Sequence, residues 1–184
     1  MLRDHDYDSL LTETLGHAAA ATGLIAQSLK FDGAITLQMQ GSGALQKLVT
    51  QCTSDLGMRG MASVAEGQAA ANFAELTTGA HCAVTVDNGE RPYQGIVDIA
   101  EESLAASLEH YFSRSVQVPS HIALLADDDF AAGILLQQVP GQTIDEADWN
   151  RLHYLIEALT RKDFAGEAAP NLIGKILAED DVRV

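Results

Sequence analysis

Residues 30–62 read KFDGAITLQMQGSGALQKLVTQCTSDLGMRGMA, and this stretch decides the fold because it contains three strand patterns in succession. Apolar and polar side chains alternate over residues 34–40, which is the period of a strand with one buried face. Residues 44–53 predict a second strand, although the spacing of their apolar side chains also suits a short helix. Residues 57–64 predict a third strand. Since glycines separate these segments, we expect turns between short antiparallel strands.

Helices are predicted on both sides of this stretch. Apolar side chains recur at helical spacing over residues 8–30, where alanine is frequent. Gly23 interrupts that pattern at a cost of about 1 kcal/mol relative to alanine, so we expect it to mark tight packing against a neighbour. A second amphipathic helix is predicted over residues 101–118, with Glu101 and Glu102 in a first turn where the helix dipole favours acidic side chains.

Two hairpins are predicted in the second half of the chain. Residues 81–86 and 93–99 alternate apolar and polar side chains around the sequence DNGE at 87–90, a strong hairpin signal. Residues 121–126 and 131–139 form a similar pair around three consecutive aspartates. Those aspartates lack the spacing and the glutamate of a calcium loop, so a solvated turn is the preferred interpretation.

The composition changes from strand to helix after residue 142. Thr143 and Glu146 are spaced as a capping box, and Pro170 suits the first turn of a last helix. The apolar stripes of these short helices need a surface to cover. We therefore expect an α+β protein with a mixed sheet core domain and packed helices over residues 1–142, followed by a helical linker arm over residues 143–184.

Charge and hydropathy exclude several classes of function. Eleven basic against 26 acidic residues give a net charge of −15, which disfavours binding to nucleic acid or to an anionic membrane. No apolar run reaches the roughly 20 residues of a membrane span. The acidic N-terminus lacks the cationic leader of a signal peptide, so the expected location is the cytoplasm.

The sequence offers little support for catalysis. The turn at residues 41–43 begins like a dinucleotide-binding fingerprint, but Gln46 replaces its third glycine. A small-molecule or nucleotide-binding enzyme that uses the Gly41–Gly43 turn remains the alternative function. Esterase elbows, Walker loops and H-E-x-x-H motifs are absent from the sequence. We therefore expect no enzymatic activity and no catalytic or cofactor-binding residue.

The remaining reactive or charged side chains favour structural roles. Cys52 and Cys82 follow no metal or redox spacing and are predicted to be buried thiols. Arg59 and Arg114 are interpreted as partners of carboxylates rather than of a ligand. No histidine has a second candidate ligand at metal spacing, so we expect no metal site among His5, His17, His81, His110, His121 and His153.

Five segments of the chain resemble the heat shock protein 33 (HslO) family of redox-regulated holdase chaperones. They occur in the family's order and spacing, and they are LKFDGAITLQMQGSG (29–43), MRG (58–60), PYQGIV (92–97), LAASLEHYFSRSVQVP (104–119) and AAGILLQQVP (131–140). The resemblance implies an ATP-independent holdase that binds unfolded client proteins and prevents their aggregation under oxidative or heat stress. It also implies a homodimer, for which the helical linker arm is the candidate contact.

The chain departs from the family pattern in two ways. The family carries a C-terminal zinc module whose C-x-C and C-x-x-C thiolates bind zinc when reduced and form disulfides when oxidised. Residues 1–184 contain neither motif, and Cys52 and Cys82 do not correspond to those ligands, so zinc is expected only in the full-length family member. The family also has an N-terminal segment with a strand before the first helix, and its loss would expose a sheet edge. The hypothesis is therefore a chaperone core with its arm, without the redox switch.

Overall fold

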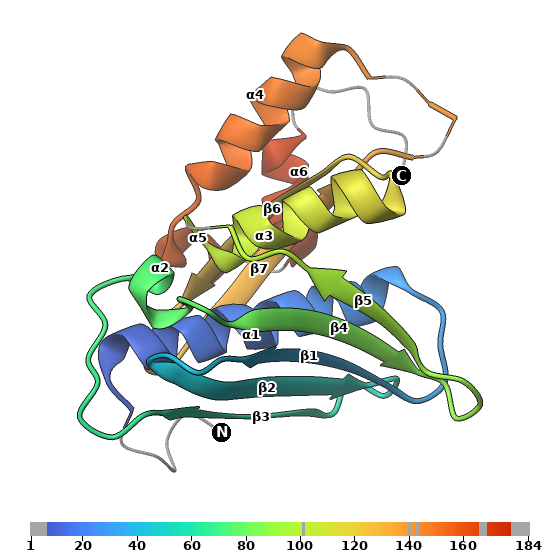
Figure 1. Cartoon of the computed structure of the whole chain (residues 1–184). Helices are drawn as coiled ribbons and strands as arrows, with labels where there is room; N and C mark the ends of the chain where they lie inside the picture. The colour runs from blue at the N-terminus through green and yellow to red at the C-terminus, as the bar shows by residue number, and fades with distance from the viewer. Residues whose placement is uncertain (1–6, 101, 140, 143, 166–168, 178–184) are drawn as a thin grey trace.

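The structure is a computed structural model that describes residues 7–100, 102–139, 141–142, 144–165 and 169–177. Its elements lie in layers: a five-stranded sheet, a layer formed mainly by helix α1 (Ser9–Ser28), a two-stranded hairpin, and a group of short helices beyond the hairpin (Figure 1). All described strand pairs are antiparallel. The α+β class is confirmed, and the mixture is one of helices and strands rather than of strand directions.

The five-stranded sheet is built around the opening stretch of the sequence. The strand order is β3-β2-β1-β4-β5, with the strands β1 (Ala34–Gln40), β2 (Leu45–Thr53), β3 (Met58–Val64), β4 (His81–Asp87) and β5 (Tyr93–Val97). At the centre, Leu37 of β1 lies opposite Thr50 and Val84. Residues 44–53 therefore form a strand, and the helical alternative is wrong because β2 pairs along the whole length of β1.

Helix α1 packs between the sheet and the second hairpin. Asp8 caps it by accepting a hydrogen bond from the Leu11 amide at 2.8 Å. The expectation that Gly23 marks tight packing is wrong, because a Cβ there would lie 3.5 Å from the nearest side chain, an ordinary contact. The close approach is at Gly16, where an added Cβ would lie 2.4 Å from the Cβ of Ala126. The chain thus needs glycine where the helix meets the hairpin.

Helix α3 (Leu104–Tyr111) begins later and ends sooner than its apolar pattern predicts. Ser103 is its N-cap, so Glu102 precedes the helix instead of lying in its first turn, and Glu101 is outside the described residues. The hydroxyl of Ser103 accepts from the Ala106 amide at 3.1 Å, which satisfies a free amide of the first turn. The chain continues as a π-helix, Phe112–Val116, and leaves it through Gln117 at a positive φ of 59°.

The second sheet is the β6–β7 hairpin, formed by β6 (Ser120–Ala126) and β7 (Ala131–Gln137), as predicted. Beyond it lie three short helices, named here the arm: α4 (Glu146–Glu157), α5 (Arg161–Ala165) and α6 (Ala169–Ile176). The predicted capping box is wrong, because Asp145 is the N-cap of α4 and accepts from the Ala147 amide at 2.8 Å; Thr143 is outside the described residues. The domain boundary after residue 142 stays a prediction.

Three smaller observations complete the fold. A short helix, α2 (Phe73–Leu76), lies in the connection between β3 and β4. Pro170 is the second residue of α6, so its predicted place in the first turn is confirmed. Within the described ranges, no helix combines the length and the apolar character that crossing a membrane requires.

Candidate functional site

The β6–β7 hairpin is covered on both faces, by the core on one side and by the arm on the other. Successive strand residues point to opposite faces. Ile122, Leu124 and Leu135 belong to the main core cluster beside α1. Their neighbours along the strands pack instead against the arm, and they are Ala123, Ile134 and Leu136. The arm therefore covers an apolar sheet face.

The arm is held to that face by a small apolar cluster. Among the described residues its buried members are Leu152, Ile156, Leu172 and Ile176. Ile156 is the most enclosed, with 1% of its surface exposed. Burying such a side chain contributes about 1.5–3 kcal/mol, whereas ordering each residue of the arm costs about 1–2 kcal/mol in backbone entropy. Few buried side chains therefore hold the arm to the hairpin.

A second contact lies at the turn of the hairpin. Arg161 of α5 pairs with the carboxylate of Asp127 and lies over the ring of Phe130 at 5.5 Å. Phe130 also meets Phe164 edge-on, with 6.1 Å between ring centroids. The predicted turn is confirmed, and its first aspartate binds the arm. Because the ion pair is exposed, it contributes about 0–1 kcal/mol, so this contact can separate readily.

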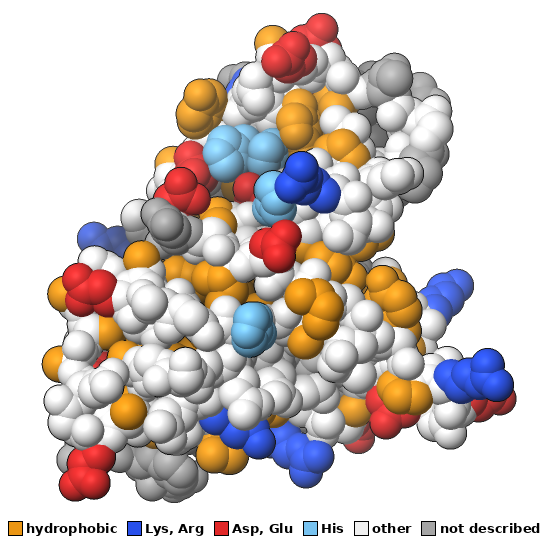
Figure 2. Space-filling model, in the orientation of Figure 1, with side chains coloured by type: hydrophobic (Ala, Val, Ile, Leu, Met, Phe, Trp, Pro, Cys, Tyr) orange, Lys and Arg blue, Asp and Glu red, His pale blue; other side chains and the backbone are white. Residues whose placement is uncertain are grey.

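Apolar side chains also remain exposed around the arm. A groove between β7 and the start of α4 is lined by three glutamines and by the apolar side chains of Leu136, Val139, Ile144, Trp149 and Leu152. Figure 2 shows apolar side chains in this upper part of the molecule, beside a group of histidines. Others on the arm are exposed by 38% or more, namely Tyr154, Leu155 and Ile173. An extended apolar segment of another protein would find contacts both in this groove and under the arm.

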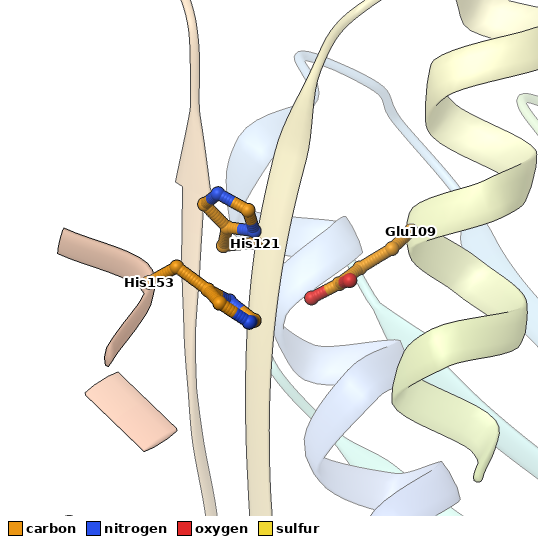
Figure 3. A group of neighbouring side chains, drawn as sticks. All are labelled: Glu109, His121 and His153. Atoms are coloured by element: carbon orange, nitrogen blue, oxygen red, sulfur yellow. The ribbon is translucent and has the colours of Figure 1, made fainter. Parts of the chain in front are cut away.

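A polar cluster lies beside the apolar contact between the arm and the core. Glu109 comes from α3, His121 from β6 and His153 from α4, and one ligand atom of each lies within 4.8 Å of the others. Figure 3 shows the three side chains directed toward one another. The Ile122 amide donates to Oε1 of Glu109 at 2.6 Å. The ring of His121 stacks on Trp149 at 4.3 Å and lies 4.2 Å from the ring of His153.

The environment of this cluster disfavours charge on Glu109 and on His121. Burial raises the pKa of Glu109. Burial, followed by the charge of His153, lowers the pKa of His121 to about 4. Three buried ring nitrogens have no hydrogen-bond partner among the described residues: Nδ1 and Nε2 of His121 and Nδ1 of His153. Sequence spacing could not reveal this cluster, because its members are far apart in the chain and belong to three separate elements.

The Gly41–Gly43 segment is a tight turn between β1 and β2. The Gly41 amide donates to the Gln46 carbonyl at 3.4 Å, and an added Cβ at Gly43 would lie 2.7 Å from the carbonyl oxygen of Thr78. Strand β2 follows the turn, so the helix N-terminus that binds phosphate in a dinucleotide site is missing here. The enzyme alternative is not supported.

The cysteines are buried thiols, as expected. Cys52 lies opposite Ile35 on one side of β1, and Cys82 lies opposite Met39 on the other. Two strand spacings across the sheet and four residues along it separate the thiols by roughly 16 Å, whereas a disulfide needs Cα atoms within about 7 Å. Burial raises the pKa of Cys82 to about 12, and it also raises the pKa of Cys52. The two thiols therefore cannot form a disulfide with each other in the folded sheet.

The structure shows no carboxylate partner for Arg59 or Arg114 among the described residues, although the sequence predicted one for each. Arg114 lies on the π-helix with Nη1 3.2 Å from Nε2 of His110, so its described polar neighbour is a histidine. Within the described ranges, no carboxylate lies at ion-pair distance from Arg59, which lines a shallow surface hollow beside Met61. The preference for carboxylate partners is therefore wrong for both, as far as the described residues extend.

Comparison with known proteins identifies the family. A family model described as Hsp33 protein matches residues 1–184. The 33 kDa chaperonin of Methylobacillus flagellatus is 38% identical over 189 residues, and that of Nitrosococcus oceani 35% over 185; each match covers 100% of this chain and 64% of the relative. The crystal structure of the 33 kDa chaperonin (heat shock protein 33 homolog) from Thermotoga maritima has the same fold, with a TM-score of 0.75, 24% identity, and coverage of 96% of this chain and 65% of that one.

The fold is that of the Thermotoga maritima protein, and the curated relatives compared here carry the name 33 kDa chaperonin. The chain belongs to the Hsp33 family. It spans 64% of the length of the curated relatives compared here.

Proposed function

We propose that residues 1–184 act as an ATP-independent holdase that binds unfolding proteins on apolar surface uncovered when the arm moves. The observation that carries this proposal is the arm-covered face of the β6–β7 hairpin, whose residues Ala123, Ile134 and Leu136 contact the arm cluster. The relatives named 33 kDa chaperonin support it. Opening the arm would present two apolar surfaces at once, the hairpin face and the stripe of α4 and α6.

The charge of the chain suits this role. A holdase complex carries exposed apolar segments and aggregates unless the surface of the chaperone keeps complexes apart. A net charge of −15 on 184 residues provides mutual repulsion between complexes. The same charge favours clients with basic segments, which it attracts at low ionic strength.

The cysteines of this chain are not expected to regulate client binding. Cys52 and Cys82 are buried on opposite sides of β1 and cannot pair without unfolding the sheet. Protection of clients by residues 1–184 should therefore be equal under reducing and oxidising conditions.

Light scattering tests the proposal. An enzyme unfolded in guanidinium chloride is diluted into buffer with increasing amounts of the chain, with and without dithiothreitol, and aggregation is followed over time. We expect scattering to fall with chaperone concentration without added ATP. An inert acidic protein of equal charge is the control for simple repulsion. Equal aggregation with the chain and with this control, in both redox conditions, would refute the proposal.

We also infer a homodimer, with the arm as the candidate contact. Exposed apolar side chains on the arm support this inference, since Tyr154 is 69% exposed and Ile173 is 50% exposed. Size-exclusion chromatography with multi-angle light scattering should give twice the mass of 19.6 kDa. A monomer mass at all accessible concentrations would contradict the inference, as would a dimer unaffected by the double change Tyr154→Ser and Ile173→Ser.

A further inference from the structure

The cluster of Glu109, His121 and His153 brings together ligand types that transition metals prefer. Imidazole nitrogens and a carboxylate oxygen are typical zinc ligands, and two histidines with one glutamate form a known set in sites that keep one position open. The ligand atoms lie within 4.8 Å of one another, although each comes from a different element. All three side chains are partly buried, so an ion can still enter from solvent.

The unpartnered nitrogens of the cluster are the second observation. A buried polar atom without a hydrogen bond destabilises the fold, and His121 has two such atoms while His153 has one. Ring stacking with Trp149 packs His121 but leaves its nitrogens unsatisfied. A bound cation would give these unpartnered nitrogens a partner, since neutral imidazole nitrogen is the form that coordinates a metal.

The surroundings hold the three side chains in place. The Ile122 amide binds one carboxylate oxygen of Glu109, which leaves the other free. Glu157 lies 3.4 Å from Nε2 of His153, and its carboxylate can orient this imidazole while Nδ1 remains without a partner. Such outer contacts to a carboxylate are typical of metal-bound histidines and fix the ring orientation.

We propose that Glu109, His121 and His153 form a binding site for one divalent transition-metal ion, with Zn²⁺ as the expected occupant. In a tetrahedral zinc site the ligand atoms lie about 3.3 Å apart. Modest rotation of the three side chains would bring their ligand atoms from within 4.8 Å of one another to that separation. Water or a further side chain completes the coordination. Ni²⁺, Co²⁺ and Cu²⁺ should also bind, because affinity at such sites follows a general order of metals rather than the protein's preference.

The site links the arm to the core. His153 belongs to α4 of the arm, whereas Glu109 and His121 belong to α3 and β6. A bound ion would thus crosslink two parts that are otherwise joined by a small apolar cluster and by the exposed contact of α5 with the hairpin turn, and it would oppose arm opening. If the proposed holdase function holds, the metal would also reduce client binding; this last consequence alone rests on that function.

Metal binding is tested with Co²⁺ and Zn²⁺ on the full chain, freed of metal by chelation. Visible absorption should show intense tetrahedral Co²⁺ bands that saturate at one ion per chain, and Zn²⁺ should displace them. His121→Gln, His153→Gln and Glu109→Gln should each weaken binding by about 100-fold or more, since loss of even an outer contact typically costs 10–100-fold. Glu109→Gln keeps an oxygen for the Ile122 amide, so it tests the carboxylate without removing that hydrogen bond.

Two further histidines provide matched controls. His81 is exposed on β4, and His5 lies between two aspartates in the sequence, which makes it a competing candidate ligand. His81→Gln and His5→Gln should leave the Co²⁺ titration unchanged. Circular dichroism without metal verifies that every variant is folded. The proposal is overturned if the wild-type chain shows no saturable binding, or if the three cluster variants bind like the wild type.

Limited proteolysis separates this proposal from the proposed function. At a free Zn²⁺ concentration of 100 times Kd, cleavage within residues 144–165 should slow by about 100-fold in the wild type and not in His153→Gln. Slower cleavage with client scattering unchanged by Zn²⁺ would support the metal site and contradict the proposed role of arm opening. Normal client protection without metal binding would refute the site and leave the holdase function standing.

Discussion

The substitution Ile156→Ala should release the arm and increase client binding. Ile156 is 1% exposed and lies at the centre of the cluster that holds α4 and α6 against the hairpin. The change removes three carbon atoms, and at about 0.8 kcal/mol for each buried carbon the arm loses about 2.4 kcal/mol of attachment, before any cavity term is added. Since 1.4 kcal/mol is a factor of ten, the population with an open arm should rise about 50-fold.

Hydrogen exchange measures this opening directly. Amides of α4 should exchange about 50-fold faster in Ile156→Ala, and in the wild type they should already exchange faster than amides of β1 at the centre of the sheet. Less chaperone should then suffice to suppress scattering by an unfolded enzyme. Ile96→Ala is the matched control, because the same side chain is 61% exposed on β5 of the five-stranded sheet and its loss should change little.

Val84→Ala distinguishes arm release from general destabilisation. Val84 is 6% exposed in the five-stranded sheet, far from the arm in the layered fold, so its truncation weakens the core and not the arm contact. Val84→Ala should not lower the amount of chaperone that is required to suppress scattering by an unfolded enzyme. The proposed mechanism is refuted if Ile156→Ala speeds exchange in α4 without improving client protection, or if Val84→Ala improves protection equally.

Three other predictions test side chains outside the arm cluster. Gly16→Ala would place a Cβ 2.4 Å from that of Ala126, so urea denaturation should show a free energy of unfolding lower by about 1–3 kcal/mol. Gly174→Ala is the control, because the added atom meets open space and the change should be neutral or slightly stabilising. Equal effects of the two changes would contradict the close packing at Gly16. Burial raises the pKa of Cys82 to about 12, so an aromatic disulfide reagent at about pH 8 should modify it only as fast as the protein unfolds, and rapid labelling of native protein would disprove its burial. Burial lowers the pKa of His17 below 6.5, so below that pH the unfolded state binds a proton that the folded state does not. The free energy of unfolding should therefore decrease as the pH is lowered from about 7 to 5. Denaturation curves over this range should show a smaller decrease for His17→Gln. An identical slope in both proteins would remove His17 as a cause.

The sequence alone was sufficient to predict those features of the structure that depend on residues close together in the chain. Alternation of apolar and polar side chains predicted the strand at residues 34–40 and the two strands of the first hairpin, because a strand with one buried face must repeat every two residues. The same reasoning placed α1 within a few residues of its ends. It also favoured a turn over a phosphate-binding loop at Gly41–Gly43, and the turn is what the structure contains.

Only the tertiary structure decided what depends on distant residues. The contact of Gly16 with Ala126 joins a helix to a hairpin more than a hundred positions away, and no local pattern distinguishes Gly16 from Gly23. For the same reason Glu109, His121 and His153 read as unrelated residues until α3, β6 and α4 bring their ligand atoms within 4.8 Å. Residues 30–62 set the strands through local alternation, whereas the layering of helix, hairpin and arm created the covered apolar face and the polar cluster, because these require chain segments that only packing brings together.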